Sequence, residues 1–405
     1  MSSTPETAGV GAPARARVTL YSLAWRWHAW AGLLVVPFLL TLALTGAVMV
    51  FFTGFQTRLG MNPTVEPLPT VQAVSAQAAA AMAAVPGGEL RTYIAPREPD
   101  RAAWFVVQRG DDTLAVAVDP YRATPLRTVD KERTPYAWAE RIHATLLIGD
   151  VGDRLIEIAA WASLVMLVTG GVLWWPRGPV RWSTRFKVDG RARGRGWWRA
   201  LHGALGAWTA VFLVGFLVTG LTWTGITGAR WLQVWDSFPA AKWYEVPASA
   251  QPHSSLNTAG LQEVPWGLAQ APMPASASPT AGAASMDLDR VAAMARDMGF
   301  AGQHQIALPK DATGVFTVSS DSMSGDSQRP TGDRTVHLDR YSGRVLADIR
   351  YEDYGPLAKT MAVATALHQG DLGWWNALLN LMVCLAVALL CVAGVAMWWK
   401  RRPAR

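Results

Sequence analysis

Four long apolar stretches divide the chain, and each is long enough to span a membrane. The predicted helices cover residues 27–52, 154–176, 200–224 and 372–399. A helix needs roughly 20 apolar residues to cross about 30 Å of hydrocarbon. The first stretch begins too far from the N-terminus, and runs too long, for a cleaved signal peptide, so we expect a retained signal anchor. The pattern therefore predicts four transmembrane helices.

Tryptophan and basic residues mark the ends of these stretches. Many of the 21 tryptophans cluster there, where an indole can hold its ring among acyl chains and its N–H among headgroups. Basic residues crowd segments 1–26, 177–199 and 400–405, which the positive-inside rule places in the cytoplasm. The long segments 53–153 and 225–371 are then periplasmic. This predicts a multi-pass protein of a bacterial inner membrane with both termini in the cytoplasm.

The composition agrees with a membrane protein and argues against a nucleic-acid partner. Only 17% of the 405 residues are charged, whereas about 25% is usual in soluble domains. The net charge of +7 comes largely from basic residues that flank the spans, as topology determinants do. Cys384 and Cys391 lie inside the last apolar stretch, which indicates small buried residues rather than a redox or metal pair.

The membrane-spanning part of the sequence repeats itself. Span one begins with His28 and span three with His202, and each histidine is followed by a glycine four and 18 residues later. The equivalent glycines are Gly32 with Gly206 and Gly46 with Gly220. His143 precedes span two as His368 precedes span four. The sequence thus indicates two copies of a helix, an outer domain and a second helix.

The two periplasmic segments also resemble each other. Residues 118–126 and 338–346 share an Asp-x-Tyr pattern that predicts a strand, a turn and a second strand. Helical stretches at 71–84 and 286–298 lie upstream of these patterns. We therefore expect a mainly α membrane protein: a four-transmembrane-helix bundle with two small α+β domains, internally duplicated, the second domain covering about 286–352.

Four histidines occupy the duplicated positions at the ends of the spans. His28 and His202 are predicted at the cytoplasmic ends, and His143 and His368 on the periplasmic side. Ionisable groups at membrane depth are costly and usually face the bundle interior for a purpose, although a histidine can also simply tolerate the headgroup region. Two histidines per leaflet are too few for a closed structural zinc site, but they match the two axial positions of a haem. We therefore predict two haems, an inner one held by His28 with His202 and an outer one held by His143 with His368.

The glycines support this interpretation. Eighteen residues make five helical turns, so His28 and Gly46 share a helix face about 27 Å apart along the axis. Each of these helices would then offer a ligand to the inner haem and a bare backbone near the outer one. Gly32 and Gly206, one turn from the ligands, would let a flat macrocycle approach. The alternative is that the glycines serve close helix packing.

Other candidate chemistry is weak. The glycine-rich run at 190–196 follows no strand and lies in no βαβ unit, so it predicts no dinucleotide site, and the electron donor must be another molecule. His253, His304 and His337 show no metal-ligand spacing and are expected to be surface or partly buried polar residues. The stretch 230–285 is rich in Ala, Pro and Ser and is expected to be loop or linker.

These elements resemble the PepSY-associated transmembrane family, which includes iron-siderophore reductases. The residues that carry the resemblance are 27–33 around His28, the Trp174-Trp175-Pro176 end of span two, the basic link into Arg199–His202, the Asp-x-Tyr turns at 119–121 and 339–341, and His368. The resemblance covers most of the chain, about residues 20–400. It implies PepSY-type periplasmic domains, two b-type haems and reduction of ferric siderophores in the periplasm.

Three functions remain open at this point. The first is a haem reductase that moves electrons from a cytoplasmic or quinol donor to a ferric siderophore; Fe(II) is softer, so oxygen ligands release it. Arg141 and Lys359 lie near the outer histidines and could attract an anionic chelate, or serve solvation alone. The second is a non-enzymatic PepSY-domain protein that binds a peptide, a protease or a transporter. The third is a cytochrome b subunit of a separate dehydrogenase. The sequence identifies no catalytic residue.

Overall fold

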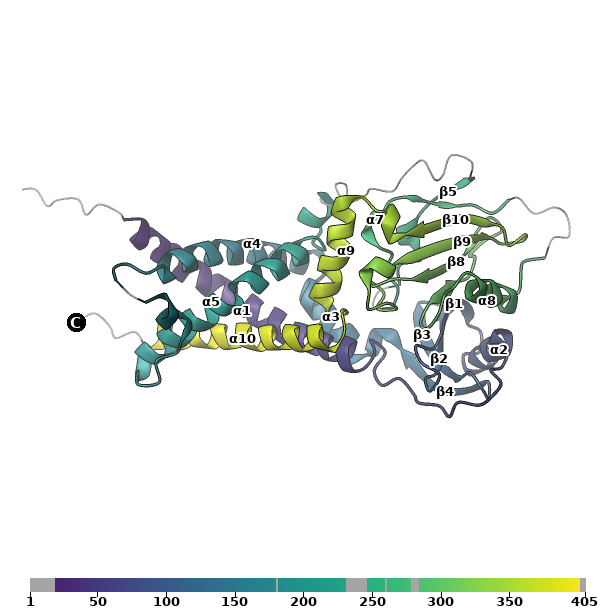
Figure 1. Cartoon of the computed structure of the whole chain (residues 1–405), viewed down its shortest axis with the longest axis horizontal. Coiled ribbons are helices and arrows are strands. Elements are labelled where there is room, and N and C mark those ends of the chain that lie inside the picture. The colour runs from purple at the N-terminus through teal and green to yellow at the C-terminus, as the bar shows by residue number, and fades with distance from the viewer. Residues whose placement is uncertain (1–18, 180, 231–245, 259–260, 278–283, 401–405) are drawn as a thin grey trace, which may run out of the picture.

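The computed structural model describes residues 19–179, 181–230, 246–258, 261–277 and 284–400. Figure 1 shows an elongated molecule with a helix bundle at one end and a β-sheet at the other. We call the end of the bundle beside the sheet the sheet end, and the opposite end the far end.

The bundle consists of the four predicted spans. They are α1 (Leu20–Phe55), α4 (Gly149–Trp174), α5 (Gly194–Leu221) and α10 (Trp374–Trp399). Each is long and apolar enough to cross a membrane. Helices α4 and α10 both pack against α1 and both pack against α5, so α1 and α5 lie diagonally across the bundle. Many large apolar side chains of these helices point outward, as expected for a surface that faces lipid.

A single antiparallel sheet of eight strands forms the other end of the molecule. Its strands are β1 (Glu89–Ile94), β2 (Ala103–Arg109), β3 (Asp112–Asp119), β4 (Thr124–Asp130), β7 (Gln305–Ala307), β8 (Val315–Ser320), β9 (Arg334–Asp339) and β10 (Val345–Arg350). The strand order is β10-β9-β8-β7-β1-β2-β3-β4. Strands β1 and β7 join the two halves, with Thr92 opposite Ala307 and Ile94 opposite Gln305. The two α+β units expected from the sequence are therefore not separate, because they share one sheet.

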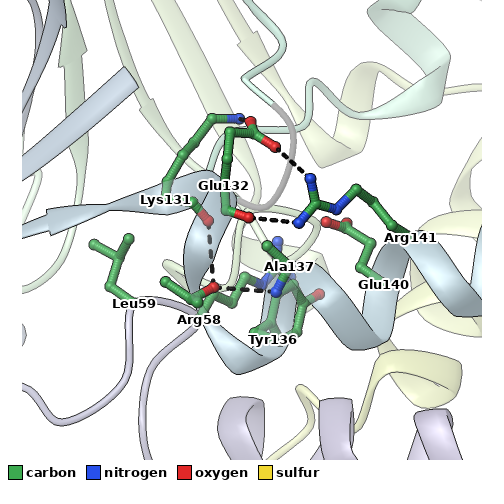
Figure 2. Close-up of a pocket in the computed structure, with 9 residues that line it drawn as sticks. Arg58, Leu59, Lys131, Glu132, Tyr136, Ala137, Glu140 and Arg141 are labelled. Carbon is green, nitrogen blue, oxygen red and sulfur yellow. Dashed lines mark hydrogen bonds and ion pairs between the residues drawn. The ribbon is translucent and has the colours of Figure 1, made fainter. Parts of the chain in front are cut away.

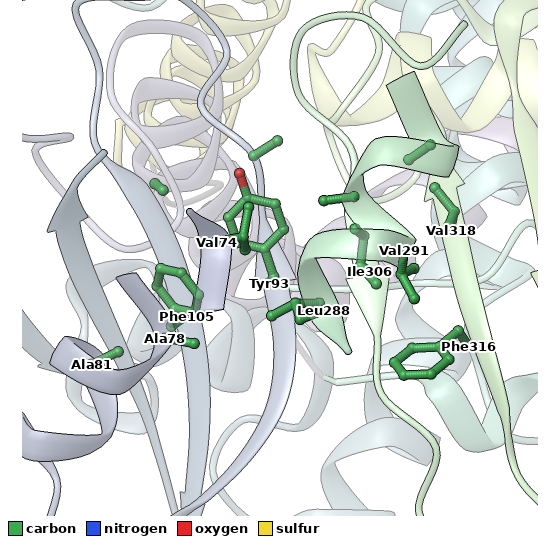
Figure 3. Close-up of a cluster of buried hydrophobic side chains, with 14 of the residues drawn as sticks. Val74, Ala78, Ala81, Tyr93, Phe105, Leu288, Val291, Ile306, Phe316 and Val318 are labelled. Atoms are coloured by element: carbon green, nitrogen blue, oxygen red, sulfur yellow. The ribbon is translucent and has the colours of Figure 1, made fainter. Parts of the chain in front are cut away.

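One hydrophobic core also spans both halves. Helices α2 (Val74–Ala84) and α8 (Leu288–Asp297) lie within the helical stretches that the sequence predicted, and their buried residues pack with the same face of the sheet (Figure 3). Phe105 of β2 and Ile306 of β7 are fully buried in this core, as are Ala81 of α2 and Val291 of α8. Burying such side chains is worth about 1.5–3 kcal/mol each for the larger ones, so the halves stabilise each other.

The repeated Asp-x-Tyr patterns form the hairpin turns at the two edges of the sheet. The Asp119 carboxylate accepts the backbone N–H of Tyr121 at 2.8 Å, between β3 and β4. The Asp339 carboxylate accepts the backbone N–H of Tyr341 at 3.0 Å, between β9 and β10. An aspartate that bonds the backbone two residues ahead favours a turn, so both predicted strand-turn-strand units are present.

The segment expected to be loop or linker contains regular structure where it is described. It forms β5 (Ala248–Pro252), α7 (Trp266–Ala269) and β6 (Pro272–Pro274). Leu268 is fully buried against Ile349 and Ala358 of the second half. The prediction was wrong for these residues because a composition rich in small residues does not reveal a few well-placed apolar anchors. Positions 231–245, 259–260 and 278–283 lie outside the described residues.

Two short helices connect the sheet to the bundle (Figure 1). They are α3 (Pro135–Thr145) and α9 (Pro356–Gln369). Each begins with proline at its first position, where the missing N–H costs nothing. Helix α9 ends at Gly370, whose φ of 86° suits glycine as a helix cap. Short 3₁₀ turns complete the described elements: Lys131–Arg133, Trp182–Phe186, His253–Leu256, Pro330–Gly332 and Tyr351–Asp353.

Candidate functional site

Two of the predicted histidines face each other across the far half of the bundle. His28 lies on α1 and His202 on α5, the two diagonal helices. Their ring centroids are 6.2 Å apart and their planes are nearly perpendicular, at 86°. We call these two residues the far pair. The structure thus brings together the first two histidines that the sequence repeat predicted to pair.

Each imidazole of the far pair is held through Nδ1 by a neighbouring helix. Nδ1 of His28 lies 3.1 Å from the Met166 carbonyl oxygen on α4. Nδ1 of His202 lies 3.2 Å from the Leu390 carbonyl oxygen on α10. A carbonyl oxygen can only accept, so Nδ1 must carry the proton in both rings. Nε2 is then a bare lone pair, the form in which imidazole binds a metal.

The other two predicted histidines lie at the sheet end, on the connecting helices. His143 of α3 packs on α1, with Nδ1 2.8 Å from the Thr45 hydroxyl. His368 of α9 packs on α5, with Nδ1 2.6 Å from the Thr219 hydroxyl. The two imidazoles are close enough to interact electrostatically. We call them the sheet-side pair.

The threonine hydroxyls fix the proton of the sheet-side pair as well. The Thr45 hydroxyl donates to the Thr41 carbonyl at 2.7 Å, and the Thr219 hydroxyl donates to the Gly215 carbonyl at 2.7 Å. Each hydroxyl has only one proton, so its oxygen must accept from the histidine. In the described part of the chain no hydrogen bond reaches Nε2 of any of these four histidines. All four are therefore tautomers that could ligate through Nε2.

A glycine lies against each of the four imidazoles. A Cβ added to Gly46 or Gly220 would lie 3.6 and 3.7 Å from Cε1 of His143 and His368, respectively. The sequence predicted these two glycines at this level. A Cβ added to Gly170 of α4 would lie 3.1 Å from Cε1 of His28, and one added to Gly394 of α10 would lie 3.8 Å from Cε1 of His202.

The glycines expected to admit a macrocycle beside the far pair have a different role. A Cβ at Gly32 would meet Met166 of α4, and one at Gly206 would meet Leu390 of α10. These contacts match the alternative of close helix packing. Sequence reasoning missed Gly170 and Gly394, which do lie beside the far pair. Their positions followed no repeat offset that we had used, although both end apolar helices that the sequence had identified.

The two pairs lie at different depths of the same bundle. Helix α1 carries His28 and, 17 residues later, Thr45; α5 carries His202 and, 17 residues later, Thr219. At about 1.5 Å per residue this is roughly 25 Å along each helix. No group of three or more His, Cys, Asp or Glu side chains suited to a metal occurs in the described ranges. The candidate site therefore consists of two histidine pairs stacked along the bundle.

A buried charge cluster sits directly above the sheet-side pair (Figure 2). Arg58, beyond the end of α1, donates to the Met323 carbonyl at 2.9 Å and contacts the Asp371 carboxylate at 3.4 Å. Its guanidinium lies 5.7 Å from the centre of the Tyr136 ring. Burial raises the pKa of the Glu140 carboxyl, which lines the same cavity of about 60 Å³. The sequence gave no signal for Arg58, because a single arginine after a span reads as an ordinary flank.

The two basic residues expected near the sheet end both make intramolecular contacts. Arg141 donates to the Glu132 carbonyl at 2.6 Å and stacks on Trp138 at 4.4 Å. Lys359 donates to the Glu352 carbonyl at 2.9 Å. These contacts occupy part of each cation, and neither residue is needed to hold the histidines.

The three remaining histidines are buried, contrary to the expectation of surface or partly buried positions. His253 and His337 are fully buried, with their Nε2 atoms 2.9 Å apart, and His304 is 7% exposed. Burial lowers the pKa of His253 to about 4, so this pair is neutral and joins 3₁₀ turn 253–256 to β9. The contact could not be read from the sequence because it links segments that lie 84 residues apart.

Four apolar helices around paired histidines, capped by an extramembrane sheet, define an integral membrane protein. The family model for the PepSY-associated TM region matches residues 25–401. The chain therefore belongs to that family, as its sequence motifs indicated. A comparison with curated proteins gave no match.

Proposed function

We propose that the protein is an inner-membrane di-haem b-type reductase that passes electrons across the membrane to a periplasmic ferric siderophore. His28 with His202 would hold one haem and His143 with His368 the other. The observation that carries the proposal is the tautomer of the four imidazoles: each is held by Nδ1 and keeps Nε2 free. Metal-bound histidines are typically anchored in this way through their second ring nitrogen.

The spacing of the far pair supports two axial ligands on one iron. A metal–imidazole bond is about 2 Å long, so two rings on opposite sides of an iron would have centres about 6 Å apart. The observed separation is 6.2 Å. Perpendicular ring planes are compatible with this arrangement, since both planes can contain the same axis. The sheet-side pair adds apolar walls, because Phe216 and Trp223 pack edge-on against His368 with ring centres 5.0 and 5.4 Å away.

A bound haem at each pair would supply one-electron redox chemistry, and the chain would supply position. Helices α1 and α5 run through both levels, so they hold the two pairs at a fixed separation. The apolar bundle keeps water from the space between them. The far pair would accept electrons from a cytoplasmic or quinol donor, and the sheet-side pair would deliver them. We expect the siderophore to approach from the sheet end; the 60 Å³ cavity beside Arg58 is too small to hold it, since ligand sites usually span about 300–1,000 Å³.

The proposed direction depends on the orientation of the chain in the membrane. Basic segments 1–26, 177–199 and 400–405 support a cytoplasmic far end under the positive-inside rule. The sheet would then be periplasmic, where ferric chelates arrive. Reduction removes iron from an oxygen-donor siderophore because these ligands prefer the harder Fe(III).

The test is made on the purified full-length chain. We expect two b-type haems per chain by extraction and by reduced-minus-oxidised spectra. Chemically reduced protein, mixed anaerobically with a ferric siderophore, should be reoxidised while Fe(II) appears in a chelating trap. A chain without haem would reject the proposal in favour of a non-enzymatic PepSY-domain protein. Haems that a quinone reoxidises but no ferric chelate does would indicate a cytochrome b subunit of a separate dehydrogenase.

A further inference from the structure

The two histidine pairs differ in what accepts their Nδ1 protons. Backbone carbonyls serve the far pair, at 3.1 and 3.2 Å. Threonine hydroxyls serve the sheet-side pair, at 2.8 and 2.6 Å. The sheet-side bonds are shorter, and each hydroxyl also donates to a helix carbonyl at 2.7 Å. Hydrogen bonds in such a chain polarise and strengthen one another.

We infer that Thr45 and Thr219 are positioning residues for the sheet-side pair: they hold His143 and His368 with Nε2 free, and they keep the reduction potential of iron bound there low. The inference rests on the proposed function. It goes further because it assigns a role to two side chains that touch neither iron nor substrate.

The direction of the effect follows from ligand basicity. A strong acceptor at Nδ1 draws the N–H proton outward and leaves more electron density on Nε2, which makes the imidazole a more basic ligand. A more basic ligand stabilises Fe(III) relative to Fe(II), because Fe(III) carries the larger positive charge. Second-shell hydrogen bonding is one of the means by which a protein sets a haem potential.

A low potential at this position suits the proposed substrate. Siderophores hold Fe(III) far more tightly than Fe(II), so ferric siderophores accept electrons reluctantly and need a strongly reducing donor. The sheet-side pair is the one that would meet them. The location of both threonines, each one residue before the glycine that faces the same imidazole, puts the acceptor and the open space for a macrocycle on one helix turn.

Valine removes the hydroxyl and preserves the shape of threonine, so Thr45→Val and Thr219→Val are the test variants. Haem content and a spectroelectrochemical titration are measured on the full-length protein, and the component lost in His368→Ala identifies the sheet-side haem. Loss of a second-shell partner typically costs about tenfold or more in metal preference. Tenfold less preference for Fe(III) corresponds to a positive shift of about 59 mV. We expect a shift of this order in the sheet-side component for each variant.

Thr169 provides a matched control at the far pair. Its hydroxyl lies 3.2 Å from Nδ1 of His28, but the Met166 carbonyl lies closer, at 3.1 Å. Thr169→Val should therefore leave the far component unmoved. Thr219→Ser keeps the hydroxyl and should keep the wild-type potential. If Thr219→Val loses the sheet-side haem, Thr219→Ser should restore it.

The outcomes separate the inference from the function on which it rests. Two haems at full content with no shift in either threonine variant would overturn the inference and leave the haem proposal intact. Loss of the haem in Thr219→Val that serine does not restore would also overturn it. A wild-type chain that contains no haem would instead overturn the proposed function itself.

Discussion

Substituting Gly170 by alanine should weaken haem binding at the far pair alone. An added Cβ would lie 3.1 Å from Cε1 and 3.5 Å from Nδ1 of His28, whereas ordinary contacts begin at 3.4 Å. The imidazole must therefore move by a few tenths of an ångström. It has little freedom to do so, because Nδ1 is bonded to Met166 on the same helix as Gly170 and His202 lies across the bundle.

The expected magnitude follows from the cost of overpacking. One extra methyl group in a well-packed interior typically costs about 1–3 kcal/mol, which corresponds to roughly 5- to 150-fold in an equilibrium constant. We expect haem affinity at the far pair to fall within this range. Haem retained per chain after dilution, with the reduced-minus-oxidised spectrum of each component, measures the loss.

Two neighbouring glycines serve as controls for Gly170→Ala. A Cβ at Gly171 would have no atom within 4 Å, so Gly171→Ala changes the same helix without touching the pair. A Cβ at Gly394 would make an ordinary 3.8 Å contact with His202. Both variants should keep both haems. Full occupancy in Gly170→Ala, or equal losses in all three variants, would refute the idea that the backbone of α4 is the wall against which His28 is placed.

Further predictions follow from the pairs, the orientation and the buried carboxylates. Replacing His28 by alanine should remove the far haem and leave the other, and replacing His368 should do the reverse; a variant that retains both haems would contradict the pairing. A cysteine placed near Asp119 should react with a membrane-impermeant thiol reagent in spheroplasts, whereas one near Arg193 should not. Burial and a neighbouring carboxylate raise the pKa of Asp326 from 3.8 to about 8, so the folded state binds more protons than the unfolded state between these values, and the contribution of this group to stability falls as pH rises toward 8. Asp326→Asn should therefore raise the thermal stability at pH 8 and flatten its pH dependence; a variant that is less stable than wild type at pH 8 would contradict this sign.

The spans and the histidine pairs could be predicted from the sequence for definite physical reasons. A membrane helix must satisfy its backbone internally and be apolar over its full length, so α1, α4, α5 and α10 leave an unmistakable pattern. The equal offsets from His28 and His202 to their glycines placed equivalent residues at equivalent depths. Periodicity within a helix is local information, and local information survives in a single sequence.

The features that the sequence did not reveal all depend on contacts between distant segments. The pairing of β1 with β7 is set by which edges remain free after each half has formed its own strands, and no local pattern records it. The burial of His253 against His337 depends on a segment whose composition predicted loop. Arg58 differs from a topology-determining arginine only through its contact with Asp371.

The single sheet also explains how the sheet-side pair can be held with the accuracy that ligation requires. Strands β4 and β10 are the two edges of the sheet, and each leads through a 3₁₀ turn into a connecting helix: β4 into α3, which carries His143, and β10 into α9, which carries His368. Two independent domains could move relative to each other and would separate these ligands. Because β1 pairs with β7 and one core fills both halves, the sheet fixes the distance between its own edges and hence between the starts of α3 and α9. A functional constellation must be held to within about 0.5 Å, and a continuous sheet with a shared core provides that rigidity where a pair of flexible domains would not.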